Sequence, residues 1–176
     1  MLLVFDGPDK AGKSTLIESL ERNDLVYHST RPFKPYSDYS IYIKAQYETI
    51  ASFSKFFIGN HLILDRFLLS EYCYSQLTRD EKVNKDSSYI FDIDKQISDN
   101  AVLIYVTANS ETIKKRIVKA KEKEITIDDV DTLLNAYYKY LKMTKIPYMI
   151  IDTTYKTIKD CNEEILSFLH IHDINL

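Results

Sequence analysis

Residues 7–14, GPDKAGKS, match the pattern G-x-x-x-x-G-K-[ST] at every fixed position, and Thr15 follows them. An apolar run, residues 2–5, comes directly before this segment, and Leu16, Ile17 and Leu20 follow it at helical spacing. A strand, a glycine loop and a helix in this order are the setting that a phosphate-binding loop (P-loop) requires. Glycine lets the backbone curl until its N–H groups surround a phosphate, and two of the three glycines of the chain lie here. The segment therefore predicts an α/β fold organised around a bound nucleotide.

The residue types of this loop predict individual roles. We expect Lys13 to reach the β and γ phosphates of ATP and Ser14 to bind Mg²⁺, while the N-terminus of the following helix adds partial positive charge. ATP and Mg²⁺ are thus the expected cofactors. The residues expected to bind the cofactor are Gly7, Asp9, Ala11, Gly12, Lys13, Ser14 and Thr15.

Short apolar runs alternate with helical patterns along the rest of the chain, which is typical of a parallel sheet covered by helices. We expect a single domain, residues 1–176, with an open five-stranded parallel sheet and helices on both faces. The expected strands are residues 2–5, 24–28, 61–64, 101–106 and 147–151. The expected helices are residues 13–22, 38–58, 67–79, 110–123, 128–145 and 156–170, which leaves residues 80–100 without an element. Ligands of such a sheet bind beyond the carboxyl ends of its strands, so the loops that follow the strands should converge on one site.

Composition limits the partners. The 176 residues are 45% apolar, enough for a core without metals or disulfides, and the two cysteines, Cys73 and Cys161, favour ordinary packing in a reducing compartment. A net charge of −3 provides no global basic surface for duplex nucleic acid. No 18 consecutive apolar residues occur, so we expect no membrane contact and a cytoplasmic location, with a small-molecule nucleotide as partner.

A GTPase switch is the first alternative for a P-loop protein. It would carry Asp-x-x-Gly after its third strand and Asn-Lys-x-Asp after a later one. Asp65 is followed by Arg66, Phe67 and Leu68, and the sequence NKDS at residues 84–87 precedes the strand expected at 101–106. The guanine motifs are therefore not matched, and a regulatory switch is disfavoured.

An acid and an arginine stand together at the end of the third expected strand. The Asp65 carboxylate can hold a Mg²⁺-bound water near the phosphates, and the Arg66 guanidinium offers a planar fork for two phosphate oxygens. The alternative is a surface ion pair at a helix start, but the position after a strand of a P-loop sheet favours the site.

These two motifs together resemble the thymidylate kinase family of P-loop deoxynucleoside monophosphate kinases. The sequence DGPDKAGKST at residues 6–15 is similar to the P-loop of that family, including its second acid, Asp9. The sequence DRFLLSEYCYS at residues 65–75, followed by Gln76 and Arg79, resembles the second family signature, with the glutamine displaced by one residue. Thr30-Arg31-Pro32 resembles the family turn after the second strand, without its glutamate.

The resemblance implies that the reaction is ATP-dependent phosphorylation of a deoxynucleoside monophosphate, with dTMP to dTDP as the leading candidate, and that a homodimer can form. It also implies that Asp9 binds the deoxyribose 3′-hydroxyl and Arg66 the acceptor phosphate, with Ser70 and Tyr74 beside the base. The full set of residues expected to bind the substrate is Asp9, Arg31, Arg66, Phe67, Ser70, Tyr74, Gln76 and Arg79.

A basic stretch from Lys114 to Lys123 falls where related kinases place a lid over the transferring phosphoryl group, and we expect a lid at about residues 114–127. A solvated helix face is the alternative for its later lysines. The cations expected to act in catalysis are Lys10, Lys13, Arg66 and Arg116, and the residues expected to serve Mg²⁺ are Ser14 and Asp65.

A second enzyme class remains open. A monophosphate acceptor is already a nucleophile, whereas a nucleoside hydroxyl needs a carboxylate to accept its proton. Deoxynucleoside kinases more often show Glu-Arg-Ser where this chain has Asp-Arg-Phe at residues 65–67. A deoxynucleoside kinase and a kinase of a modified deoxynucleotide are therefore kept as alternatives, and the base preference is open.

Overall fold

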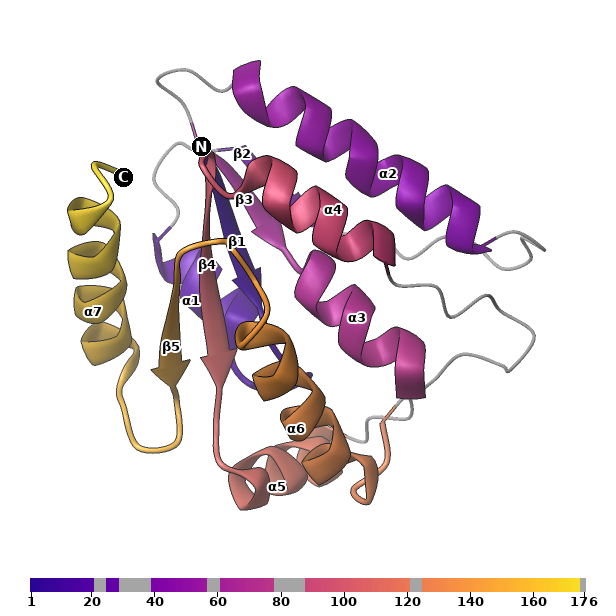
Figure 1. Cartoon of the computed structure of the whole chain (residues 1–176). Helices are drawn as coiled ribbons and strands as arrows, with labels where there is room; N and C mark the ends of the chain where they lie inside the picture. Colours follow the sequence, from indigo (N-terminus) through magenta and orange to yellow (C-terminus); the bar gives the residue numbers. More distant parts are fainter. Residues whose placement is uncertain (21–24, 29–38, 57–60, 78–87, 121–124, 175–176) are drawn as a thin grey trace.

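The computed structural model describes residues 1–20, 25–28, 39–56, 61–77, 88–120 and 125–174. Its sheet is parallel throughout, with the strand order β2-β3-β1-β4-β5 (Figure 1). The strands are β1 (Leu2–Asp6), β2 (Leu25–His28), β3 (Leu62–Asp65), β4 (Ala101–Thr107) and β5 (Tyr148–Asp152). The helices are α1 (Lys13–Leu20), α2 (Tyr39–Phe53), the 3₁₀ turn η1 (Ser54–Phe56), α3 (Leu68–Leu77), α4 (Ser88–Ile97), α5 (Ser110–Ala120), α6 (Asp129–Leu141) and α7 (Ile158–Ile171).

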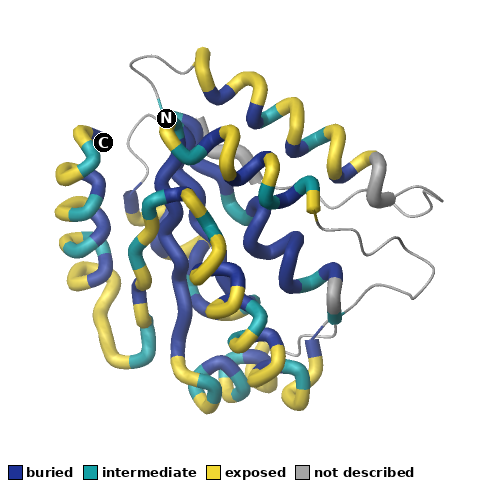
Figure 2. The backbone as a smooth tube through the Cα atoms, in the orientation of Figure 1, coloured by how far each residue is buried: buried dark blue, intermediate teal, exposed yellow. Residues whose placement is uncertain are grey.

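Helices cover both faces of this sheet, as the alternation of patterns predicted. Alternate residues of β1 point to opposite faces, so Leu2 and Val4 belong to one core while Leu3 and Phe5 belong to the other. The first core is completed by helices α2 to α6, and the second by α1 and α7. Figure 2 shows the central strands buried and the outward sides of the helices exposed. The open α/β sheet is confirmed. None of the helices in the described ranges is both long and apolar enough to cross a membrane.

Strand β1 lies between β3 and β4, so the chain turns to opposite sides of β1 as it continues. At this switch point the carboxyl ends of three strands meet, with Phe5 paired to Asp65 and Asp6 paired to Tyr105. The loop after β5 reaches the same edge, because Thr107 pairs with Asp152. The expected convergence of these loops is therefore observed.

Helix α4 is absent from the expected elements, and this omission was wrong. Its buried residues Ile90, Ile93 and Ile97 recur at intervals of three and four, which is the helical period. The pattern was thus available in the sequence, directly after residues 84–87, which had been considered only as a guanine motif. The expected helix 38–58 is also shorter than predicted, because α2 ends at Phe53 and gives way to η1.

A buried acid of α4 fastens this helix to the end of α6. Asp94 is 1% exposed. Its carboxylate accepts hydrogen bonds from the Tyr140 hydroxyl (2.7 Å), the Thr144 hydroxyl (2.5 Å) and the Lys145 N–H (2.7 Å). Three donors on one carboxylate replace the water that burial removes from it.

Replacing Asp94 by alanine should lower the free energy of unfolding by about 2–3 kcal/mol, because it leaves three inward-facing donors without their acceptor. Asp92→Ala is the matched control, since Asp92 lies on the same helix and is exposed. Urea unfolding of both variants measures the difference. Equal losses in the two variants would mean that helix propensity, and not the buried carboxylate, sets the effect.

Candidate active site

The P-loop follows β1 with a backbone that its two glycines make possible. Gly7 has a φ of +148° and Gly12 a φ of +105°. A Cβ added to Gly7 would lie 2.0 Å from the carbonyl oxygen of Val106, at the end of β4. Glycine is therefore required at position 7, because the end of β1 and the end of β4 approach each other too closely for a Cβ.

Asp6, the last residue of β1, holds the P-loop against the first turn of α3. Its buried carboxylate accepts hydrogen bonds from the N–H groups of Gly7 (2.7 Å), Phe67 (2.9 Å) and Ser70 (2.9 Å), and from the Ser70 hydroxyl (2.5 Å). Burial raises the pKa of Asp6, although the hydrogen bonds from Ser70 and Phe67 oppose this shift. The sequence indicated Asp6 only as part of the P-loop pattern, so its bridging role was missed.

Lys13 lies inside the loop and is 6% exposed. Its ammonium group donates hydrogen bonds to the carbonyl oxygens of Gly7 and Pro8, both at 2.8 Å. Burial and the nearby positive charge of Arg66 lower the pKa of Lys13 to about 8, against the opposing effect of Asp9 and other acids. The positive charge of Arg66 thus adds to burial in disfavouring the charged form of Lys13.

Arg66 enters the site from the turn after β3. Its φ is +74°, and its N–H donates to the Phe5 carbonyl (2.9 Å). The guanidinium forms an ion pair with the Asp9 carboxylate and lies 5.4 Å from the centre of the Tyr74 ring. The Tyr74 hydroxyl donates to Asp9 (2.9 Å) and accepts from the Asp9 N–H (3.1 Å). Asp9, Arg66 and Tyr74, separated by up to 65 residues, are therefore brought together as one group.

The charge of Asp9 follows from this group. Burial raises the pKa of Asp9, but the positive charges of Arg66 and Lys13 outweigh burial and lower it below its ordinary value. Asp9 is consequently a stable carboxylate and a weak proton acceptor at neutral pH.

Ser14 and Asp65 form the second pair that the sequence predicted. The Ser14 hydroxyl donates to the Asp65 carboxylate at 3.5 Å, so both oxygens lie at the mouth of the P-loop. A hydroxyl and a carboxylate are hard oxygen ligands that fit Mg²⁺, and phosphate oxygens and waters normally supply the remaining positions. The two residues thus fit a Mg²⁺ ion bound together with a nucleotide.

These groups line a cavity of about 720 Å³ that runs from Arg66 past the P-loop to the start of α7. Six cationic side chains face two carboxylates there, although the chain as a whole is acidic. The cations are Lys10, Lys13, Arg66, Arg116, Lys119 and Lys156, and the acids are Asp9 and Asp65. Leu16, Ala120, Ile158 and Cys161 add apolar surface to the lining. Such a cavity suits a ligand with a charged phosphate chain and a flat ring.

Comparison with known proteins supports this description. No protein-family model matches the sequence. The SPbeta prophage-derived uncharacterized protein YorR of Bacillus subtilis (strain 168) is 26% identical over 136 residues, which cover 77% of this chain and 79% of that protein. The crystal structure of YorR in complex with phosphorylated GDP aligns with a TM-score of 0.77 and 20% identity over 98% of both chains. Deoxyadenosine kinase from M. mycoides with bound dATP aligns with a TM-score of 0.61 and 20% identity, over 97% of this chain and 100% of that one.

The fold is similar to that of YorR and of the M. mycoides deoxyadenosine kinase. Identities of this size show the fold alone, and the narrower resemblance to thymidylate kinases is not supported by these neighbours. The open parallel sheet accounts for the position of the site, because such sheets bind ligands beyond the carboxyl ends of their strands.

Arg116 of α5 lines the cavity, and its guanidinium contacts the P-loop backbone and Thr153. One terminal nitrogen donates to the carbonyls of Lys10 (3.1 Å) and Ala11 (3.3 Å) and to the Thr153 hydroxyl (2.9 Å). The other donates to the Thr153 carbonyl (3.0 Å). Lys10 is exposed at the rim of the cavity with a φ of +63°.

Two residues expected at the substrate lie buried and do not line the cavity. Phe67 is 1% exposed, with its ring 4.8 Å from that of Tyr47, and Ser70 is bound to Asp6 and lies 3.2 Å from the Tyr137 hydroxyl. Arg31 and Arg79 lie outside the described residues, and Gln76 lies on α3 with its side chain outside them. Their roles stay predictions.

The lid predicted at residues 114–127 falls partly on α5, and its residues 121–124 lie outside the described part. Lys114 pairs with Asp131, and the exposed Lys115 pairs with Glu111. No role was predicted for Thr153, Lys156 or Ile158, although the loop after β5 was expected at the site. The rule that ligands bind beyond the carboxyl ends of the strands identifies the loop, but it does not identify which side chains of the loop face the cavity.

The lowered pKa of Lys13 makes phosphate binding pH-dependent. Phosphate oxygens favour the ammonium form, so binding should be strongest below pH 8 and weaken by up to about tenfold per pH unit above it. Calorimetric titration with ADP between about pH 7 and pH 10 tests this expectation.

Lys13→Arg is the control for this titration, because a guanidinium stays charged throughout that range. The variant should bind more weakly overall and show no fall above pH 8. A fall that persists in the arginine variant would assign the pH dependence to a different group.

Proposed function

We propose that the chain is a phosphotransferase that transfers a phosphoryl group from ATP, bound with Mg²⁺, to a deoxynucleoside monophosphate. The observation that supports it most is that two cations, Lys13 and Arg66, line one cavity, where the positive charge of Arg66 helps to lower the pKa of Lys13. Two adjacent cations are unfavourable unless anions accompany both. In the proposed reaction, the phosphate chain of the donor is the anion beside Lys13, and the phosphate of the acceptor is the anion beside Arg66.

The proposed roles follow the positions of the side chains. Lys13 binds the donor phosphates, Arg66 binds the acceptor phosphate through its planar fork, and Ser14 and Asp65 hold Mg²⁺. The metal supplies neutralisation of charge on the phosphates. Because the acceptor phosphate is itself the nucleophile, no strong base is required, which agrees with the low basicity of Asp9.

Asp9 has a second part in this proposal. An acceptor phosphate competes with the Asp9 carboxylate for Arg66, so the substrate releases Asp9 from its ion pair. The carboxylate, still held by Tyr74, is then available to a sugar hydroxyl, the role that the family resemblance assigns to it. This exchange favours acceptors that carry both a phosphate and a hydroxyl, with dTMP as the first candidate.

A deoxynucleoside kinase is the second candidate, because the fold is also similar to that of deoxyadenosine kinase. That chemistry needs a carboxylate that accepts the proton of the nucleoside hydroxyl. Asp9 is one of the described acids that line the cavity. Its lowered pKa makes it poorly suited to accept this proton.

The experiment that separates the two is ATP consumption with Mg²⁺ against the four deoxynucleosides and their 5′-monophosphates. Turnover confined to monophosphates is expected. Turnover of nucleosides alone would establish the second candidate, and turnover of neither would exclude both.

Arg66→Ala should raise the KM for the acceptor monophosphate by about 100-fold, because it removes a bidentate, charge-assisted contact. ATP affinity should change by less than about threefold, since the donor phosphates are held by the P-loop. Steady-state kinetics and calorimetry give the two values. Alanine keeps the Cβ, so the backbone strain at this position is unchanged. Equal losses of acceptor and ATP binding would exclude the acceptor role.

The partner of the proposed enzyme is a small-molecule nucleotide. The proposed cytoplasmic location of the enzyme rests on the sequence alone. A two-fold dimer through the helices beside the acceptor site is the assembly that the family resemblance implies. Light scattering at several protein concentrations measures the mass in solution and tests it.

A further inference from the structure

The guanidinium of Arg116 joins three segments that are far apart in the sequence. It extends from α5 to the P-loop carbonyls of Lys10 and Ala11, and to Thr153 in the loop after β5. The Thr153 hydroxyl, which accepts from Arg116, itself donates to the Ala11 carbonyl at 2.7 Å. The Ala11 carbonyl is therefore held by two donors at once.

This arrangement sets the direction of a P-loop N–H group. In a planar trans peptide the carbonyl and the following N–H point in opposite directions. Holding the Ala11 carbonyl therefore fixes the N–H of Gly12, a residue that lines the cavity and has a φ of +105°. P-loops bind phosphate through such inward N–H groups, so their direction controls affinity.

The same contacts prevent Arg116 from serving as a free charge. Its two terminal nitrogens already have four acceptors between 2.9 and 3.3 Å. Turning the guanidinium toward a phosphate would break these contacts and release the Ala11 carbonyl from one of its two donors.

We propose that Arg116 and Thr153 are positioning residues, which hold the P-loop peptides in their phosphate-binding orientation and lock the P-loop to the loop after β5. The identity of the ligand, a nucleoside triphosphate, rests on the proposed function. The orientation of the loop does not depend on the proposed function, and it can be measured in the free protein.

Four variants and one control distinguish positioning from charge. Arg116→Lys keeps the charge but loses the planar fork, and Arg116→Met removes both. Thr153→Val removes the hydroxyl, whereas Thr153→Ser keeps it. Lys115→Met, on the same helix, removes an exposed charge that does not line the cavity. Melting temperatures of all five establish that they are folded.

Binding of inorganic tripolyphosphate with Mg²⁺ is the first measurement, because this probe has no base. Arg116→Met and Arg116→Lys should both weaken it by about tenfold, the value of one or two hydrogen bonds. Thr153→Val should weaken it severalfold, with Thr153→Ser and Lys115→Met close to the wild type. The double variant Arg116→Met/Thr153→Val should lose less than the product of the single losses, because both act on one carbonyl.

Hydrogen exchange of the free protein is the second measurement. Amides of residues 10–13 should exchange faster in Arg116→Lys and Thr153→Val than in the wild type or Lys115→Met. Normal binding and exchange in Arg116→Lys, with weak binding only in Arg116→Met, would show that Arg116 acts through charge and would overturn the proposal. Failure of the wild type to bind tripolyphosphate or ADP would refute the proposed function. Unchanged amide exchange in Arg116→Lys and Thr153→Val would refute the positioning role, whether or not the wild type binds these ligands.

Discussion

The buried carboxylate of Asp6 is the contact on which the geometry of the site depends. It accepts hydrogen bonds from Gly7 in the P-loop and from Phe67 and Ser70 at the start of α3. A buried carboxylate without these donors would be strongly unfavourable, so the four contacts form together or not at all. The P-loop and the turn that carries Arg66 are consequently one rigid unit. In the proposed function, this contact sets the separation of the donor and acceptor sites before any ligand binds.

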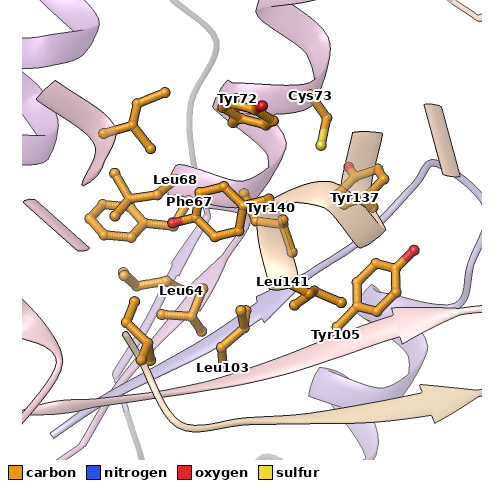
Figure 3. Close-up of a cluster of buried hydrophobic side chains, with 14 of the residues drawn as sticks. Leu64, Phe67, Leu68, Tyr72, Cys73, Leu103, Tyr105, Tyr137, Tyr140 and Leu141 are labelled. Atoms are coloured by element: carbon orange, nitrogen blue, oxygen red, sulfur yellow. The ribbon is translucent and has the colours of Figure 1, made fainter. Parts of the chain in front are cut away.

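A layer of tyrosines between the sheet and the helices α3 and α6 supports this unit. Tyr105 stacks on Tyr137 with 5.3 Å between ring centres (Figure 3). Tyr140 stacks on Phe91 of α4 with 5.7 Å between ring centres. Each buried tyrosine hydroxyl of this layer has a polar neighbour: Tyr137 has Ser70 and Tyr140 has Asp94. The layer therefore combines apolar packing with directional contacts. It links the Asp94 contact of α4 to the Asp6 contact beneath the site.

The sequence predicted the features that depend on local pattern and on strand order. The P-loop, the α/β sheet and the convergence of the loops that carry Asp9 and Arg66 follow from a motif and from the rule that parallel strands end at one edge. The hydrogen-bond partners of Arg116 could not be predicted, because a long side chain can reach several carbonyl groups that lie within a few ångströms of one another. Phe67 and Ser70 matched a family signature, but in this chain they pack the core and bind Asp6. Their places beside a base stay predictions.

Five described residues have a positive φ, and four of them, Gly7, Lys10, Gly12 and Arg66, lie in the P-loop or in the turn that faces it. Lys10 and Arg66 are not glycines, and each holds a left-handed conformation that costs about 1–2 kcal/mol. Glycine at either position would relax the backbone and remove a cation from the cavity. Selection for thermal stability alone would therefore erode this site first, because the native state is least relaxed where its chemistry is concentrated.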